Sequence, residues 1–167
     1  MFCLLLPALL SPDLAAPAVR GQYVEARTCD VFTGSCFANA DTGLTGKNAV
    51  LAWKVTSGTV SGTRLDGLGV VAVVAVRSAK VDLTICNCDG DGCATLTAGA
   101  VKIQTRCLDA HHDRACGNES TIYPPLAKGV SAKAAMATEH SFKGPGLNET
   151  WTDHDRRGAF VGSFATR

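Results

Sequence analysis

Residues 100–107 read "AVKIQTRC", and this stretch decides the fold class because its alternation is the cleanest in the chain. Val101, Ile103 and Thr105 alternate there with three polar residues. Successive side chains of a β-strand point to opposite faces of the sheet. The pattern therefore predicts a half-exposed strand that packs one face against a core.

Several further stretches also favour strands. "QYVEART" (22–28) suits an edge or first strand, and "NAVLAWKVTSG" (48–58) and "KVDLTI" (80–85) suit two more. The run from Val70 to Val76 is apolar without interruption, which predicts a strand buried on both faces. "TWTDHDRRGAFVGSF" (150–164) predicts two short strands on either side of a charged turn.

One stretch has good helical propensity. "SAKAAMATEH" (131–140) is rich in alanine, although its apolar stripe is weak. "YPPLAKG" (123–129), just before it, predicts a connection broken by proline. We therefore expect an α+β, β-dominated fold: a single small sheet-based domain with turn-rich, cysteine-pinned loops.

Length and charge limit the classes of function. A chain of 167 residues is long enough for one domain with its own core. Sixteen basic and fifteen acidic side chains give a formal net charge of +1, so the bulk charge indicates no nucleic-acid partner. No internal repeat or long linker divides the sequence.

The first eighteen residues resemble an export signal. An apolar run from Phe2 to Leu10 precedes Ala16-Pro17-Ala18, which fits a cleavage site. The run is shorter than the roughly 20 residues that a membrane-spanning helix needs. We expect a signal at 1–18, a single β-rich domain at 19–167 without a membrane span, and a periplasmic or extracellular location.

Export favours disulfides, because an oxidising compartment pairs cysteines. The expected mature chain has seven cysteines, Cys29, Cys36, Cys86, Cys88, Cys93, Cys107 and Cys116. We expect local bridges Cys29–Cys36 and Cys107–Cys116, and one bond within or from the segment 86–93. A disulfide that closes a loop of about 15 residues stabilises the fold by about 3 kcal/mol.

The segment 86–93, "CNCDGDGC", also permits a metal site. Cys86 and Cys88 are too close in sequence to pair without strain, and soft thiolates at such spacing suit Zn or Cu(I). The alternative hypothesis is thus a soft-metal site of Cys86, Cys88 and Cys93, with His111 or His112 as a further ligand. Asp89 and Asp91 do not match a calcium-binding loop and favour a tight turn.

A third hypothesis is a thiol-dependent enzyme. It would pair Cys107 with His140 or with His154, as a nucleophile and its base. No local motif supports this pair, and no phosphate-binding glycine loop is present. A non-enzymatic role is therefore favoured over this hypothesis, and the one cofactor that the sequence indicates is the Zn or Cu of the alternative hypothesis.

The order of motifs adds a resemblance. "YVEARTCDVFTGSCFAN", "AVLAWKV", "LDGLGVVAVV", "GCATLTAGAVKIQTRCL" and "DRRGAFVGSF" together resemble a bacterial family catalogued as a domain of unknown function (DUF1326). The resemblance implies a single α/β domain and no particular activity. It also implies that a central helical segment is missing here, because only "RSAKVDLTI" lies between the apolar run and Cys86.

Together these observations predict an exported, cysteine-rich domain with a non-enzymatic binding or structural role. Its partner would be a protein or a small ligand.

Overall fold

A computed structural model shows which of these elements form. It describes residues 18–34, 48–73, 75–77, 82–85, 93–108, 117–145 and 149–166. Every helix or strand in these ranges is a β-strand, which confirms a β-dominated fold. The helical part of the expected α+β class is not found among them. The expected export signal lies outside these ranges, apart from Ala18.

The strands follow one another along the chain as β1 (Val19–Arg27), β2 (Phe32–Gly34), β3 (Ala49–Val60), β4 (Thr63–Arg64), β5 (Gly69–Val73), β6 (Ala75–Arg77), β7 (Asp82–Ile85), β8 (Ala94–Ala98), β9 (Val101–Arg106), β10 (Gly117–Ile122), β11 (Val130–Phe142) and β12 (Trp151–Thr166). The main sheet has the antiparallel order β6-β5-β3-β1-β12-β11-β9-β8-β7, and β4 pairs with β3. β2 and β10 form a separate two-stranded sheet. No helix in the described ranges is long and apolar enough to cross a membrane.

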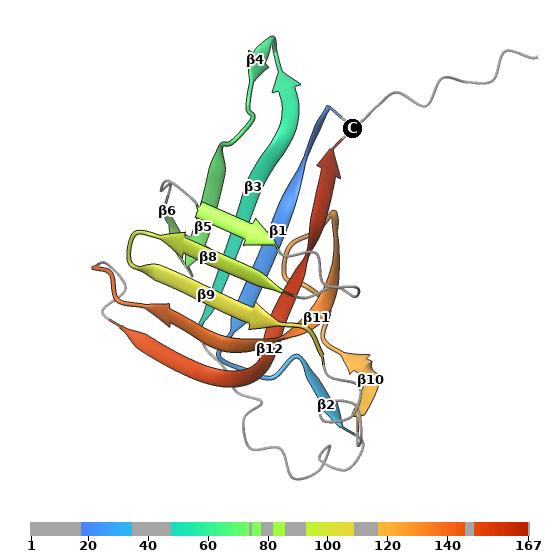
Figure 1. The fold of residues 1–167 in the computed structure, drawn as a ribbon, viewed down its shortest axis with the longest axis vertical. Coiled ribbons are helices and arrows are strands. Elements are labelled where there is room, and N and C mark those ends of the chain that lie inside the picture. Colours follow the sequence, from blue (N-terminus) through green and yellow to red (C-terminus); the bar gives the residue numbers. More distant parts are fainter. Residues whose placement is uncertain are drawn as a thin grey trace, which may run out of the picture.

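The main sheet curls until one half lies over the other. In Figure 1, β7, β8 and β9 cross in front of β5, β3 and β1, and the two long strands β11 and β12 join the halves. Residues 159–166 of β12 pair with β1, whereas residues 136–142 of β11 pair with β9. The two long strands thus run from one layer into the other.

A β-bulge marks the bend. The register of β11 against β12 shifts between Ala135 and Ala137, and its register against β9 shifts between Ala137 and Glu139. On β12, Asp155 has a φ of 50°, a left-handed conformation that is uncommon outside glycine. Bulges bend strands and increase their twist, and they commonly make the corners where strands change sheets. We call residues 135–140 of β11 and 153–156 of β12 the corner.

The inner face of the curled sheet encloses the main core. This core joins residues from both ends of the strand order, among them Val71 and Val73 of β5 and Leu83 of β7. The Nζ of Lys54, on β3, donates a hydrogen bond to the carbonyl oxygen of Leu83 at 3.0 Å. This bond connects the two layers directly and satisfies a carbonyl group on the edge strand β7.

A second, smaller core lies on the outer face of the sheet. It contains Tyr23, Val31, Phe32, Met136 and Phe160. β1 serves both cores, because Val24 and Ala26 belong to the inner one and Tyr23 to the outer one. The segment 123–129 covers part of the outer core, and we call it the strap.

Several expected elements are confirmed. Val101, Ile103 and Thr105 are buried on β9 and alternate with exposed or half-buried polar residues, as the sequence predicts. Strands also form at 49–60 and 82–85, and the strap is an irregular connection. β1 is the first strand of the chain, as one of the two expected alternatives had it, and it lies between β3 and β12 and not at an edge.

The helix expected at 131–140 is wrong, since these residues belong to β11. β11 pairs with β12 on one side and with β9 on the other. In isolation, an alanine-rich stretch favours a helix, in which its backbone groups bond to each other. Here two neighbouring strands satisfy the same backbone groups. Tertiary pairing therefore overrides a weak local propensity.

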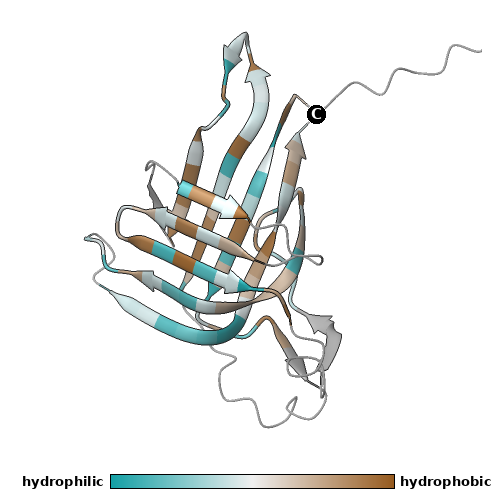
Figure 2. Ribbon diagram, viewed as in Figure 1, coloured by the Kyte–Doolittle hydropathy of each residue, from teal (hydrophilic) through white to brown (hydrophobic). Residues whose placement is uncertain are grey.

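Two other expectations are also corrected. The apolar run from Val70 to Val76 is not one doubly buried strand: β5 and β6 pair as a short hairpin at the sheet edge, and Val70 is 44% exposed. The stretch 150–164 is one continuous strand and not two strands with a turn. Figure 2 shows its first half hydrophilic and its second half more apolar, and the bulge lies between them.

Gly162 provides a test of this arrangement. A Cβ atom at this position would overlap the carbonyl oxygen of Ser131 and lie 2.5 Å from the Cα of Ala132, both on β11. We expect Gly162→Ala to lower the free energy of unfolding by about 1–3 kcal/mol, because β11 cannot move aside without losing its register. Urea unfolding measures the change. Ser163→Ala, at the exposed neighbouring position, is the control and stays within about 0.5 kcal/mol of wild type; equal effects would contradict the register.

Candidate functional site

Two groups of buried polar side chains stand out, one on the outer face of β1 and one at the corner. The first consists of Tyr23, Glu25 and Arg27, which share one face of β1 because they are two residues apart. Glu25 is fully buried, and Arg27 is 8% exposed. Buried charges are costly unless they are paired and hydrogen-bonded.

The carboxylate of Glu25 is fully engaged. Its Oε1 accepts a hydrogen bond from Nε of Arg27, and its Oε2 accepts one from the hydroxyl of Tyr23. Oε2 also accepts the backbone N–H of Leu126 at 3.0 Å. The guanidinium of Arg27 lies 5.6 Å from the ring centre of Phe160, which adds a cation–π contact. This group is an ion pair within a network of hydrogen bonds.

The same three side chains bind the strap. Besides the bond from Leu126 to Glu25, Arg27 donates from Nη2 to the carbonyl oxygen of Pro124 at 2.6 Å. Tyr23 also has a hydrogen bond with the backbone of Ala127. Burial, and then the neighbouring Glu25 carboxylate, raise the pKa of Tyr23 far above its ordinary value. The phenol therefore keeps its proton and remains a donor.

The corner holds the second group. His140 is fully buried on β11, and its Nδ1 accepts a hydrogen bond from Nε1 of Trp151 at 3.2 Å. Its Nε2 lies 3.5 Å from Oδ2 of Asp153. Burial lowers the pKa of His140 below its ordinary value, and Asp153 opposes this shift. His140 is therefore neutral near pH 7.

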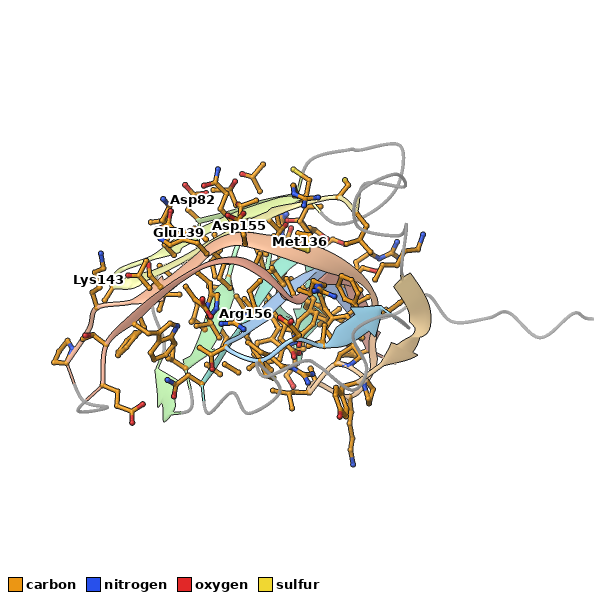
Figure 3. All side chains as sticks on the ribbon, turned by 90° about the horizontal axis from the view of Figure 1, so that it is seen from below. Asp82, Met136, Glu139, Lys143, Asp155 and Arg156 are labelled. Carbon is orange, nitrogen blue, oxygen red and sulfur yellow. The ribbon has the colours of Figure 1, made fainter. Side chains whose placement is uncertain are left out.

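Arg156 links the corner to the end of β1. It donates from Nε and Nη2 to the carboxylate of Asp153 at 3.0 and 3.3 Å, and its Nη1 lies 3.8 Å from Oδ1 of Asp30. The bonds to Asp153 raise the pKa of Arg156. In Figure 3, Arg156 lies beneath the arch of the sheet, and Glu139 and Asp155 lie on the other side.

Most of the expected metal site lies outside the described residues. Cys86, Cys88, His111 and His112 lie outside the described residues. Cys93 is described and is disulfide-bonded, so in this form its sulfur is not a thiolate ligand. Among the described residues, no group of three or more His, Cys, Asp or Glu could hold a metal ion.

The two expected local disulfides are not formed in this structure. Cys29 and Cys107 are both half-buried thiols, and the expected partners Cys36 and Cys116 lie outside the described residues.

The Cys–His pair of the third hypothesis is not assembled either. His140 pairs with Ile103 of β9, and Cys107 is four residues further along the chain, about 13 Å in an extended strand. His154 is exposed and pairs with Glu139, which in turn pairs with Gln104. The strand register thus brings neither histidine to Cys107.

Sequence reasoning missed both buried polar groups. The spacing of Tyr23, Glu25 and Arg27, each two residues from the next, was a visible signal in a predicted strand, because it places all three on one face. No comparable signal marked His140, since its contacts with Trp151 and Asp153 depend on the pairing of β11 with β12.

Comparison of the chain with protein-family models, with curated proteins and with solved structures finds no match. The resemblance to the DUF1326 family therefore stays a prediction.

The buried ion pair of Glu25 and Arg27 on β1 should contribute strongly to the free energy of unfolding. We expect Glu25→Gln to lower the free energy of unfolding by about 3–5 kcal/mol, because it leaves the buried guanidinium of Arg27 without a countercharge. The matched control is Glu139→Gln, which breaks the more exposed contact of 2.6 Å with Lys102. That change should cost at most about 1 kcal/mol. Chemical denaturation measures both, and a similar loss in the two variants would rule out the structural role of Glu25.

Proposed function

We propose that the chain is an exported, non-enzymatic binding domain that contacts a protein partner through the outer face of the sheet. The observation that carries this proposal is the position of its exposed apolar side chains. Soluble domains scatter such residues singly, whereas a group on one face indicates an interaction surface.

The exposed apolar residues gather on one side. Val70 on β5 pairs with Trp53 on β3, and Leu68 lies beside Val55, whose N–H donates to the Leu68 carbonyl oxygen. Leu68 is 57% exposed. Directly paired residues of neighbouring strands lie on the same face of a sheet. Trp53 pairs with Tyr23, and their ring centres are 5.4 Å apart, so Val70 lies on the outer face with Tyr23. Leu68, two residues before Val70, lies on that face too. We call Trp53 and Val55 of β3, Val70 of β5 and Leu68 just before β5 the outer apolar surface.

The strap, whose backbone is bound on this outer face, carries two more exposed apolar side chains. Tyr123 is 58% and Leu126 is 57% exposed, although the backbone around them is held by Arg27 and Glu25. Because this backbone is already held in place, binding would have to order only the side chains and not the segment that carries them. A large exposed apolar residue outside this face, among those described, is Val60 near the tip of the β3–β4 hairpin.

Export is supported by two observations. The first residues have the pattern of a signal, and Cys93 is disulfide-bonded, as is common outside the cytoplasm.

Dye binding tests whether the outer apolar surface is accessible. We expect the double variant Leu68→Ser/Val70→Ser to bind the hydrophobic dye bis-ANS at least about fivefold more weakly, which corresponds to about 1 kcal/mol of lost apolar contact. Val60→Ser is the matched control, since it removes an exposed valine elsewhere, and should leave dye affinity unchanged. Equal effects of the two substitutions would contradict a single apolar surface.

Site-specific crosslinking tests the partner. A photoreactive amino acid at position 70 should give a discrete adduct in an envelope extract, and the same group at the exposed position 97 should not. Unlabelled wild-type protein should compete for the adduct, and the Leu68→Ser/Val70→Ser variant should not. Failure of this pattern would contradict partner binding through this face.

A further inference from the structure

The hydrogen bond between Trp151 and His140 fixes which nitrogen of the neutral imidazole carries the proton. The indole N–H of Trp151 can only donate, so Nδ1 of His140 must carry a lone pair to accept it. The neutral imidazole therefore carries its one proton on Nε2. That N–H faces Oδ2 of Asp153 at 3.5 Å.

A second proton on this imidazole can bind only Nδ1. The new N–H of Nδ1 and the indole N–H of Trp151, both donors, would then point at each other. The bond from Trp151 would break, and its indole N–H would lose its acceptor. Trp151 is the first residue of β12, pairs with Phe142 at the end of the β11–β12 hairpin, and packs against the main core. Its ring centre is 5.3 Å from that of Phe142.

We propose that His140 and Trp151 form an acid-sensitive latch, in which protonation of His140 releases Trp151 and loosens the end of the β11–β12 hairpin.

The surrounding charges make the latch open in acid and remain closed near neutral pH. Asp153 would stabilise an imidazolium, but its Oδ2 already accepts Nε of Arg156 at 3.0 Å. Arg156 and the nearby His154, both on β12, oppose a positive charge on His140, and burial opposes it most. His140 therefore protonates at a lower pH than an exposed histidine.

The other elements around His140 add little charge. On β9 the residue paired with His140 is apolar Ile103. The ion pair of Lys102 and Glu139 lies on the opposite face of β9 and β11, by the alternation of those strands. Asp30, beyond the end of β1, is linked to the corner through Arg156. Asp153 is thus the acidic group that faces His140 directly.

Nuclear magnetic resonance of the indole N–H groups tests the latch. Trp53 and Trp151 are the two tryptophans of the chain, so each gives one signal. As the pH falls from 7.5, the Trp151 signal should move with a midpoint below the ordinary histidine pKa of about 6.5, while the Trp53 signal stays in place. His140→Gln should abolish the movement. His154→Gln, the exposed control, should preserve it.

A second variant keeps the test decisive if His140→Gln does not fold. Trp151→Phe removes the donor that occupies Nδ1, so His140 should protonate at a pH higher by about half a unit or more in a titration of its ring signals. A Trp151 signal that stays constant down to the pH of unfolding would overturn the proposal. So would a titration of His140 that is unchanged in Trp151→Phe.

The latch also predicts a dependence of stability on pH. The pKa of His140 is lower in the folded than in the unfolded chain, so the unfolded chain binds more protons between the two values. The contribution of neutral His140 to the free energy of unfolding is complete above about pH 6.5, and it is lost as the pH falls through the pKa of His140 in the folded chain. The urea midpoint should fall over this window less in His140→Gln than in wild type. Equal falls would count against the latch.

Discussion

A sheet without a covering helix has to bury its inner face against itself, and the rest of this structure depends on that constraint. In the described part of the chain every regular element is a strand, so no helix is present there to cover the sheet. The bulge in β11 and β12 lets both strands bend from one layer into the other. Val71 of β5 and Leu83 of β7, near opposite ends of the strand order, consequently share one core.

The same constraint explains why polar groups are buried. A sharp bend brings backbone and side chains of β11 and β12 together with the end of β1, and His140, Asp153 and Arg156 pair there. On the outer face, β1 lies between β3 and β12 and not at an edge, so its outward side chains also become buried once the strap covers them. Glu25 and Arg27 satisfy the strap's backbone groups, which irregular segments cannot satisfy among themselves. The exposed apolar side chains next to this covered region form the surface that we propose for partner binding.

Sequence periodicity predicted the strands whose faces differ in polarity. Val101 to Arg106 is the clearest case, because one face of β9 is buried and the other is in water. Prediction failed where pairing or bending decides the outcome. Residues 131–140 have helical propensity but are held between two strands, and the charged residues near Asp155 form a bulge within one strand. The buried group on β1 could have been found from its spacing, whereas the contact of His140 with Trp151 could not, because it requires the register of two strands. The expected ligands Cys86 and Cys88 lie outside the described residues.

The folding of the sheet over itself is the central claim, and the contact between Lys54 and Leu83 tests it most directly. These residues lie on β3 and β7, in opposite layers, with Lys54 Nζ 3.0 Å from the Leu83 carbonyl oxygen. Nuclear Overhauser spectroscopy should therefore show cross-peaks between the side-chain methylene protons of Lys54 and the protons of Leu83. If Leu83 shows such contacts only with β8 and none with β3, the two layers do not enclose a common core and the account is wrong.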